Sequence, residues 1–395
     1  MGAKWDPEGR KCVLLDELLY RKAFRAVKSI KKRYFRRVLG DFNRKLLGTM
    51  DDGSWSREDR DRQYKEDVLP YWKRFGYVPE KFWFELNCSR ERRMDPRFIP
   101  SDLYYNELLP YINNLPFRYA IQDKCSLDLR FGDVKQAKTI CRRMAGVFYS
   151  PDMEVIDGEK AMELCLQQKG DLFIKPSIYT SAGVGIKKFA PKECTEDDIC
   201  ELFTETGKNF IVQEKIRQHP ELAKLNPDSV STIRVTSLFL DGEVYISNIM
   251  IRVGPPGASH VAVDGGYSVA VLDDGRLYTR AYRDKGAWVS GAEEGLYDDS
   301  IRVPGLEKIR AAVMRLHPLI PYFKWIGWDF SVDEEGDPVM IEFNNSPGDD
   351  IQRVCGNPLF GDMTDRVLED FFHTRAMEND QFSTMWCGTD VIRRY

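Results

Sequence analysis

The stretch that decides the fold runs from Trp325 to Gly348 and reads WIGWDFSVDEEGDPVMIEFNNSPG. Two runs rich in β-branched and aromatic residues flank the polar loop Asp333–Pro338, a pattern that predicts an antiparallel hairpin. Side chains alternate between the two faces of a strand, so one face of this hairpin collects the large apolar residues. Those residues are Trp328, Phe330, Val332, Val339, Ile341 and Phe343.

The opposite face of the hairpin carries polar side chains. A simple register pairs Asp329 with Glu342, and Asn344 shares the face of Glu342. The same register places Ser331 opposite Met340. Two carboxylates directly opposite each other repel unless a shared proton or a cation offsets their charge. Oxygen donors of these types suit Mg²⁺, and the alternative interpretation is an exposed polar face without a ligand.

A second motif has the composition of a phosphate site. The run Phe173–Ser177 reads as a strand that ends near Lys175, and the small, glycine-bearing segment Ser181–Gly185 follows it. Backbone N–H groups of such a segment can approach phosphate oxygens closely. No GxxxxGK[ST] or GxGxxG motif occurs, which excludes P-loop and dinucleotide-binding loops. Taken alone, a lysine at a strand end also fits a solvated side chain.

Composition narrows the class of protein. The 395 residues carry 58 Lys and Arg against 62 Asp and Glu, a net charge of −4, so we expect no nucleic-acid partner. That length suggests two or three domains. No run of 18 apolar residues occurs and the first residues lack a signal peptide's apolar core, so we expect a cytoplasmic protein. The nine cysteines include no CxxC pair, which favours reduced thiols.

Residues 1–115 are expected to be mainly helical. Arg21–Lys45 carries eleven Lys and Arg and one Asp, and its apolar residues recur every three or four positions. One interpretation is a solvated basic face over a packed apolar stripe. The other is a peripheral contact with a membrane surface or an anionic glycan. The stripe consists of Phe24, Val27, Ile30, Tyr34, Val38 and Phe42.

From about residue 116 the pattern changes to short strands mixed with helices, which predicts an α+β fold. Asp241-Gly242 lies between two strand-like runs, a signal for a two-residue hairpin turn. The expected helices lie near residues 133–146, 157–169, 195–207 and 305–316.

Taken together, these motifs resemble the ATP-grasp superfamily, and most closely its sugar-transfer-associated branch. The resemblance covers roughly residues 116–365, and its strongest motif is Asp329 followed by Glu342-x-Asn344-x-x-Pro347-Gly348. It implies two α+β subdomains that clasp ATP, preceded by the helical region. The expected divisions are 1–115 for the helical region, 116–215 for the lid subdomain and 216–395 for the catalytic subdomain.

The resemblance also implies a nucleotide site. Lys124 and Lys175 match the two phosphate-contacting lysines, and Gln213 and Glu214 match the hinge strand beside the adenine. Glu221 matches the residue that contacts the ribose hydroxyls, and His219 is the alternative candidate for this contact. The segment after Lys175 matches the mobile loop that closes over the phosphates. The nucleotide-binding residues implied are Lys124, Lys175, Ser181, Gly183, Gly185, Gln213, Glu214 and Glu221.

By the same resemblance, Arg234 matches the arginine that steadies the transferring phosphate, and it forms the catalytic pair with Lys175. Asp329, Glu342 and Asn344 match the metal ligands, which implies ATP and two Mg²⁺ ions as cofactors. A further group of arginines has two readings, contact with an anionic substrate or a structural role. Its members are Arg252, Arg280, Arg283 and Arg353.

The function implied is an ATP-dependent, ADP-forming ligase that activates a carboxylate as an acyl phosphate. The nucleophile is expected to be an amine, with a thiol or hydroxyl as alternatives. A role in surface-glycan or peptide-conjugate biosynthesis fits the branch. Two other functions stay open, a kinase of the same fold acting on a sugar or small-molecule hydroxyl, and a non-catalytic nucleotide-binding protein.

Overall fold

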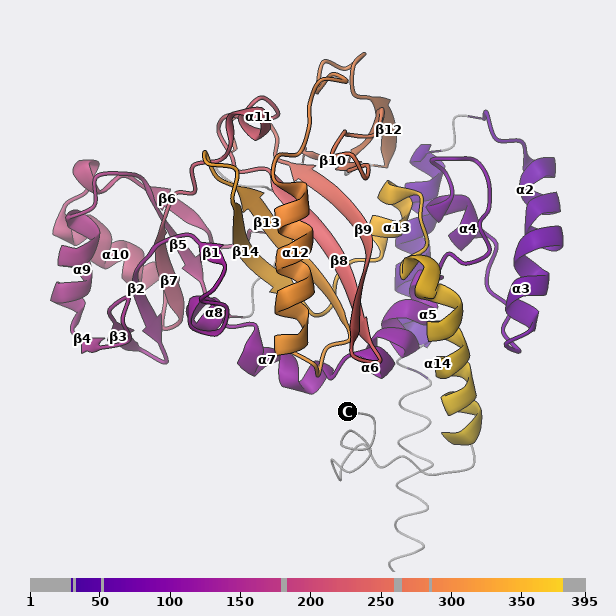
Figure 1. The fold of residues 1–395 in the computed structure, drawn as a ribbon, viewed down its shortest axis with the longest axis horizontal. Coiled ribbons are helices and arrows are strands. Elements are labelled where there is room, and N and C mark those ends of the chain that lie inside the picture. Colours follow the sequence, from indigo (N-terminus) through magenta and orange to yellow (C-terminus); the bar gives the residue numbers. More distant parts are fainter. Residues whose placement is uncertain are drawn as a thin grey trace, which may run out of the picture.

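The structure is a computed structural model that describes residues 30, 33–50, 53–178, 183–258, 265–283 and 286–378. Two β-sheets lie side by side, and helices cover their faces (Figure 1). The fold is therefore α+β, as predicted.

The larger sheet has eight strands in the order β1-β14-β13-β8-β9-β10-β11-β12. The predicted hairpin forms β13 and β14, next to the edge strand β1, and the chain turns from β8 to β9 at Asp241-Gly242, which confirms both hairpin predictions. Its strands are β1 (Lys135–Gln136), β8 (Thr232–Leu240), β9 (Glu243–Val253), β10 (Tyr267–Ala270), β11 (Arg280–Arg283), β12 (Ala287–Ser290), β13 (Trp325–Val332) and β14 (Pro338–Asn344).

Helix α12 (Leu306–Leu316) lies across one face of this sheet (Figure 1). It buries Ile309, Val313 and Leu316 against the strands, and Trp328 of β13 packs into the same core. The apolar spacing of three and four residues along α12 produces this single buried stripe.

The smaller sheet has six strands in the order β4-β3-β2-β7-β5-β6, and it packs against α9 (Gly158–Leu166) and α10 (Glu196–Thr206). Both helices were predicted. The helix expected over 133–146 is wrong, because most of this stretch forms strands. Its strands are β2 (Thr139–Met144), β3 (Val147–Tyr149), β4 (Val155–Ile156), β5 (Leu172–Pro176), β6 (Lys187–Phe189) and β7 (Phe210–Glu214).

The N-terminal region is mostly helical, as predicted, and forms a second core on the other face of the large sheet. That core joins Trp72 and Phe84 of the helical region to Leu238, Trp325 and Phe371. Figure 1 shows α14 beside these helices. The helices of the region are residues 33–50, α2 (Arg57–Gln63), α3 (Leu69–Lys73), α4 (Phe82–Asn87), α5 (Ser101–Leu103) and α6 (Leu109–Ile112), with π-helical turns at Tyr64–Val68 and Tyr104–Leu108.

The remaining helices connect these layers. They are α7 (Arg118–Ile121), α8 (Leu127–Arg130), α11 (Pro220–Ala223), α13 (Asp350–Cys355) and α14 (Thr364–Glu378), together with 3₁₀ turns at Leu115–Phe117, Lys124–Ser126, Pro191–Glu193, His317–Leu319 and Gly361–Met363. No helix among the described residues is long and apolar enough to cross a membrane. The seven cysteines that the structure describes are free thiols.

The packed apolar stripe expected for the basic helix is wrong at the positions the structure describes. Tyr34, Val38 and Phe42 are 71%, 50% and 65% exposed, and Ile30 is 66% exposed. The helix instead uses a different face to contact the helical region, because partners in the tertiary structure select the buried face. Phe24 and Val27 lie outside the described residues.

His317 is a buried, neutral histidine behind the large sheet. Its Nε2 lies 2.8 Å from the carbonyl oxygen of Phe323, which can only accept, so Nε2 carries the proton. Its Nδ1 lies 2.7 Å from the Ser237 hydroxyl, which Trp328 Nε1 also contacts at 2.8 Å. Burial lowers the pKa of His317 to about 4.

This pKa predicts acid destabilisation. As pH falls from about 6.5, the unfolded chain takes up a proton on His317 before the folded chain does, so stability is lost down to about pH 4. The loss is about 3 kcal/mol at 1.36 kcal/mol per pH unit. Urea unfolding between pH 7 and pH 4 measures it. His317→Gln should flatten the pH dependence, whereas His373→Gln, at an exposed position, should leave it unchanged.

Candidate active site

Asp329 and Glu342 lie directly opposite each other in the β13–β14 ladder, as the sequence pattern predicted. Asn344 is opposite Gly327, and its Nδ2 donates to Asp329 Oδ2 at 3.0 Å. The two carboxylates and the amide therefore share one face of the hairpin.

A β-bulge separates this polar cluster from the rest of the hairpin. After the Asp329–Glu342 pair, Phe330 pairs with Met340, so Ile341 is the extra residue. The predicted pairing of Ser331 with Met340 is wrong by one residue, because Ser331 pairs with Val339. Met340 consequently joins the core and Ile341 is only half-buried. The bulge lets the apolar end of β14 face the core while Glu342 faces Asp329.

Arg234 of β8 completes the cluster from the neighbouring strand. It lies opposite Asp329 in the ladder and donates to both carboxylate oxygens, Nε to Oδ1 at 2.5 Å and Nη2 to Oδ2 at 2.8 Å. Both residues are buried. Burial alone would lower the pKa of Arg234, but Asp329 holds it above its usual value. The two hydrogen bonds therefore hold the pair in one fixed, bidentate geometry.

Gly327 allows this close packing. A Cβ at this position would lie 2.9 Å from Pro347 Cβ and 3.1 Å from Arg234 Cδ. A larger residue would push the arginine away from Asp329.

Two lysines approach the same cluster from the smaller sheet and the turn before it. Lys124 Nζ lies 3.4 Å from Glu342 Oε2. Lys175, at the end of β5, donates to Gln213 Oε1 at 3.2 Å. Burial lowers the pKa of Lys175 to about 8; Glu342 raises it in part, and Lys124 lowers it. A dianionic or trianionic phosphate group would relieve this repulsion between two close lysines.

The remaining predicted nucleotide residues lie along the small sheet and α11. Glu214 accepts from Lys138 Nζ at 2.8 Å, and Glu221 from Lys224 Nζ at 2.6 Å. His219 caps α11 by accepting from the Glu221 N–H. These carboxylates are thus paired locally and are not joined to the Asp329 cluster by any contact that the structure describes.

The predicted mobile loop is described only in part. Gly183 and Gly185 have positive φ angles of 74° and 80°. A Cβ on Gly185 would lie 2.8 Å from the Pro176 ring, so the loop packs tightly against the end of β5. Ser181 lies outside the described residues.

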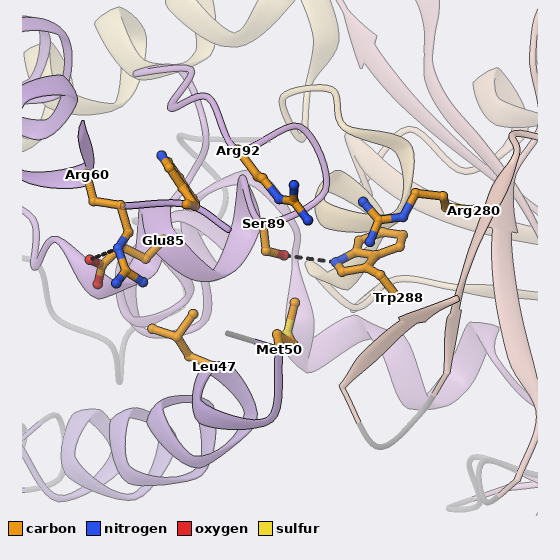
Figure 2. Close-up of a pocket in the computed structure, with 9 residues that line it drawn as sticks. Leu47, Met50, Arg60, Glu85, Ser89, Arg92, Arg280 and Trp288 are labelled. Carbon is orange, nitrogen blue, oxygen red and sulfur yellow. Dashed lines mark hydrogen bonds and ion pairs between the residues drawn. The ribbon is translucent and has the colours of Figure 1, made fainter. Parts of the chain in front are cut away.

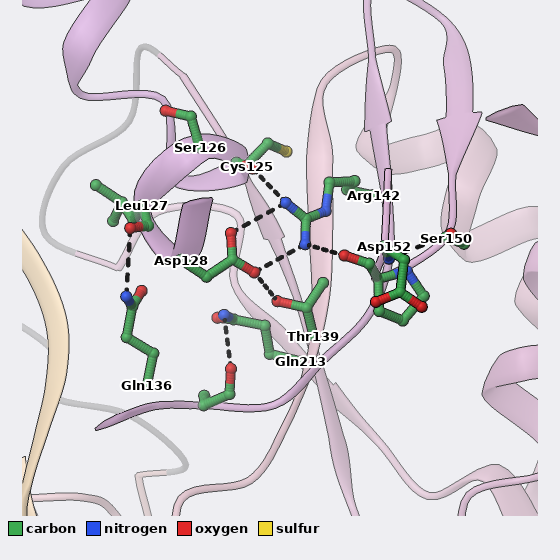
Figure 3. Close-up of polar contacts among 12 residues, drawn as sticks. Cys125, Ser126, Leu127, Asp128, Gln136, Thr139, Arg142, Ser150, Asp152 and Gln213 are labelled. Atoms are coloured by element: carbon green, nitrogen blue, oxygen red, sulfur yellow. Dashed lines mark hydrogen bonds and ion pairs between the residues drawn. The ribbon is translucent and has the colours of Figure 1, made fainter. Parts of the chain in front are cut away.

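A buried ion pair fixes the turn that carries Lys124 (Figure 3). Arg142 of β2 is fully buried, and its guanidinium donates to both oxygens of Asp128 at 3.0 and 2.8 Å. The same group donates to the carbonyl oxygens of Cys125 and Pro151. The turn that carries Lys124 is therefore attached to the small sheet. The helix expected over 133–146 is therefore replaced by a strand in which Arg142 meets partners outside that stretch.

Residues of the helical region hold the loop that follows Asn344, a feature that the sequence analysis missed. Tyr104 Oη donates to Pro347 O at 2.7 Å, and Tyr105 Oη donates to Asp349 Oδ1 at 3.0 Å. The Ser101 hydroxyl donates to the other Asp349 oxygen. Burial raises the pKa of Asp349. A buried tyrosine or serine has no local sequence signal, so only the tertiary structure reveals this support.

Asn113 is the most fully bonded of these supports. Its Nδ2 donates to Trp325 O at 2.6 Å and Asn345 O at 2.7 Å, and its Oδ1 accepts from Trp325 N at 2.9 Å.

Asn113→Ala leaves three buried backbone groups unpaired, so we expect a loss of about 3 kcal/mol in the free energy of unfolding. Urea denaturation measures this loss. Asn114→Ala is the matched control, and an equal loss there would contradict the assignment.

The polar cluster fits a hard cation in its chemistry. Carboxylate oxygens each have two acceptor sites, so the bonds from Arg234 leave Asp329 with capacity for a further partner. The side-chain nitrogen of Asn344 donates to Asp329, so its Oδ1 is left as a ligand atom for a cation. Within the described ranges no three His, Cys, Asp or Glu side chains are placed so that they could hold a metal ion together. The fit therefore rests on two carboxylates and one amide.

Of the four candidate arginines, Arg252 lies beside this cluster and pairs with Asp350. Its Nη2 lies 3.4 Å from Asp350 Oδ2, and Asp350 in turn helps to hold the pKa of Arg234 high. Arg353 is buried and donates to Tyr282 Oη at 2.9 Å, which is a structural role. Arg283 pairs with Glu294, and Arg280 lies over the Trp288 ring.

Two cavities border the helical region, and none of the predicted nucleotide or metal residues lines either of them. The smaller, about 20 Å³, has room for one water and lies between Met50, Ser89 and Trp288 (Figure 2). The larger, about 700 Å³, is lined by Arg90 and Arg97, whose guanidinium groups are paired with Glu91 and Asp95.

Two sheets, with lysines reaching from one towards an Arg–Asp–Glu–Asn cluster on the other, define the ATP-grasp class of fold. The chain belongs to the sugar-transfer associated ATP-grasp family, whose model matches residues 153–366. Membership of this family implies ATP binding.

Solved ATP-grasp ligases are similar to this chain in structure. VanG D-Ala:D-Ser ligase from Enterococcus faecalis is 17% identical, with coverage of 63% of this chain and 61% of that one and a TM-score of 0.39. D-alanyl-alanine synthetase A from Vibrio cholerae is 13% identical, with coverage of 64% and 65% and a TM-score of 0.39. D-cycloserine synthetase DcsG is 14% identical, with coverage of 67% and 73% and a TM-score of 0.39.

The chain thus spans less than two thirds of the length of the first two of these ligases. No curated protein sequence matches it.

Proposed function

We propose that this protein is an ATP-dependent, ADP-forming ligase that activates a carboxylate as an acyl phosphate. The observation that carries the proposal is the meeting of Lys124 from one side with Glu342 and the Arg234–Asp329 pair on the other. Positive and negative groups held in fixed positions are what phosphoryl transfer requires, since its catalysis is mainly positioning and charge stabilisation.

The reaction runs in two steps. A carboxylate oxygen of the substrate attacks the γ-phosphorus of ATP, the bond to the bridging oxygen breaks, and its electron pair leaves with ADP. A nucleophile, an amine in our proposal, then attacks the acyl carbon; phosphate leaves with the C–O electron pair and the nitrogen loses a proton. No protein nucleophile is needed.

The chain's own residues supply the charges. Lys124 and Lys175 neutralise phosphate oxygens of the nucleotide, and Arg234, held by Asp329, faces the transferring group. Asp329, Glu342 and Asn344 would hold Mg²⁺, which supplies charge neutralisation when bound. Gln213 and Glu214 meet the adenine, Glu221 the ribose, and the segment from Ser181 to Gly185 covers the phosphates.

In this proposal the smaller sheet belongs to a lid subdomain over 116–215, and the larger sheet, apart from β1, belongs to a catalytic subdomain over 216–395. A carboxylate on a glycan or a peptide conjugate is the substrate class we propose, and the family description, which associates these proteins with sugar transfer, supports it.

Thermal unfolding with and without Mg·ATP tests the nucleotide site. Ligand at 100 times its Kd should stabilise the wild type by about 2.7 kcal/mol. The variant Glu342→Gln should lose the Mg²⁺-dependent part of the shift and retain its unliganded stability. An equal shift in wild type and variant would contradict the cation assignment.

Hydroxylamine trapping tests the reaction class. An acyl phosphate reacts with hydroxylamine to a hydroxamate, so candidate carboxylates that release ADP should give equal amounts of hydroxamate. ADP release with a stable phosphorylated alcohol and no hydroxamate would identify a kinase instead. ATP binding without turnover of any carboxylate or alcohol offered would favour a binding protein.

A further inference from the structure

The helix over residues 33–50 has two apolar faces. One face packs against the helical region through Leu39, Leu46, Leu47 and Met50, which contact its core. Figure 2 shows Leu47 and Met50 directed from this helix towards the neighbouring elements. Asn43, on the same face, is buried.

The other face is an exposed apolar row, which we call the outer row. It consists of Ile30, Tyr34, Val38 and Phe42, which are 66%, 71%, 50% and 65% exposed. At about 100° per residue, a spacing of four places Tyr34, Val38 and Phe42 in one stripe of this helix, roughly opposite the packed face, and Ile30 precedes them at the same spacing in the sequence. Single exposed apolar side chains are ordinary, but a row of four large ones marks an interaction surface.

Basic side chains accompany the outer row. Arg33 and Arg37 lie along one border of it, and Lys45 continues beyond its end; all three are exposed. Arg36 and Arg44 form ion pairs with Asp102 and Glu80 of the helical region, whereas Arg37 lies 3.9 Å from Asp41 of its own helix. These two pairs tie the helix to the protein, while the other cations remain on the outside.

We propose that the outer row docks this protein on an anionic membrane surface. A helix with an apolar stripe beside basic side chains lies in the plane of the interface, with the apolar stripe inserted among the headgroups. Each Lys or Arg near an anionic surface strengthens the binding further. The contact is a surface contact, since no described helix can span a bilayer.

The attachment of this helix would hold the active site close to the surface. Arg36 pairs with Asp102, and the adjacent Ser101 donates to Asp349 in the loop that follows the Glu342–Asn344 motif. The docking proposal does not depend on the proposed reaction, because it rests on the exposed row and its charges alone.

Vesicle co-sedimentation of the full chain tests the proposal. We expect binding to phosphatidylglycerol vesicles and little binding to phosphatidylcholine vesicles. The variant Tyr34→Ser/Val38→Ser/Phe42→Ser should weaken binding at least about tenfold, since it removes most of the inserted area. The matched control Val78→Ser/Val155→Ser/Leu319→Ser changes equally exposed apolar residues elsewhere and should bind as the wild type does.

A charge variant separates the electrostatic contribution to vesicle binding from the apolar contribution. Arg33→Gln/Lys45→Gln should weaken binding to anionic vesicles and reduce its dependence on salt. Equal binding by the serine variant and the wild type would overturn the proposal, and so would no vesicle binding at all. A dimer in solution that the serine variant abolishes, or binding to a sulfated polysaccharide without vesicle binding, would assign the outer row to another partner.

Discussion

Glu342→Gln should reduce ADP formation by about a thousandfold or more while the protein stays folded. The substitution keeps the shape and an acceptor oxygen for Lys124 but removes the negative charge. Without that charge, the repulsion between Lys124 and Lys175 is less well offset. Asp329 also loses the second carboxylate with which it would hold a cation. Removal of a single charge-stabilising group from such a site typically costs several kcal/mol of transition-state stabilisation.

The stability of this variant should change little. The Glu342–Lys124 contact is 3.4 Å long and partly exposed, and such pairs contribute about 1 kcal/mol or less. Coupled detection of ADP gives the rate, and thermal unfolding verifies the fold. Glu334→Gln, at an exposed position in the turn of the same hairpin, is the control and should retain full activity. Near-normal turnover by folded Glu342→Gln would remove Glu342 from the site.

Arg234→Ala should have the second largest effect, and it should act on both stability and rate. Asp329 would stay buried without its bidentate partner, which costs about 3–5 kcal/mol in the free energy of unfolding. In the protein that remains folded, kcat should fall about a hundredfold to a thousandfold, with a smaller change in KM for ATP.

Arg234→Lys separates the two effects. Lysine keeps the positive charge beside Asp329 but cannot form the bidentate pair. The free energy of unfolding should therefore largely recover relative to Arg234→Ala, while kcat stays low. Measurement of kcat well below the unfolding temperature distinguishes the two contributions. An unchanged kcat in folded Arg234→Lys would place this residue outside the transition state and leave it a structural partner of Asp329.

The part of this site that the sequence predicted correctly depends on local patterns. The alternation of side chains in Trp325–Gly348 requires only neighbouring residues, so the hairpin and the Asp329–Glu342 pairing were accessible without a structure. The order of the motifs was enough to indicate the family. The roles of the nucleotide residues remain predictions, because geometry alone does not distinguish a nucleotide contact from a local ion pair such as Glu221–Lys224.

The errors share one physical cause, which is dependence on partners distant in sequence. Arg142 is buried in a strand because Asp128 and the carbonyl groups of Cys125 and Pro151 meet it. The bulge at Ile341 arises where β14 must satisfy both the core and the polar cluster. Neither arrangement leaves a periodic signal in the chain.

The sequence by itself determined the α+β class, the β13–β14 hairpin and the order of motifs that indicated the ATP-grasp family, since these depend on alternation, spacing and order. Only the tertiary structure decided that Arg234 is locked to Asp329, that Asn113 and Tyr105 support the loop behind the site, and that the outer row of helix 33–50 is exposed. Burial of a polar or apolar side chain depends on what packs against it, and those partners come together only when the chain folds.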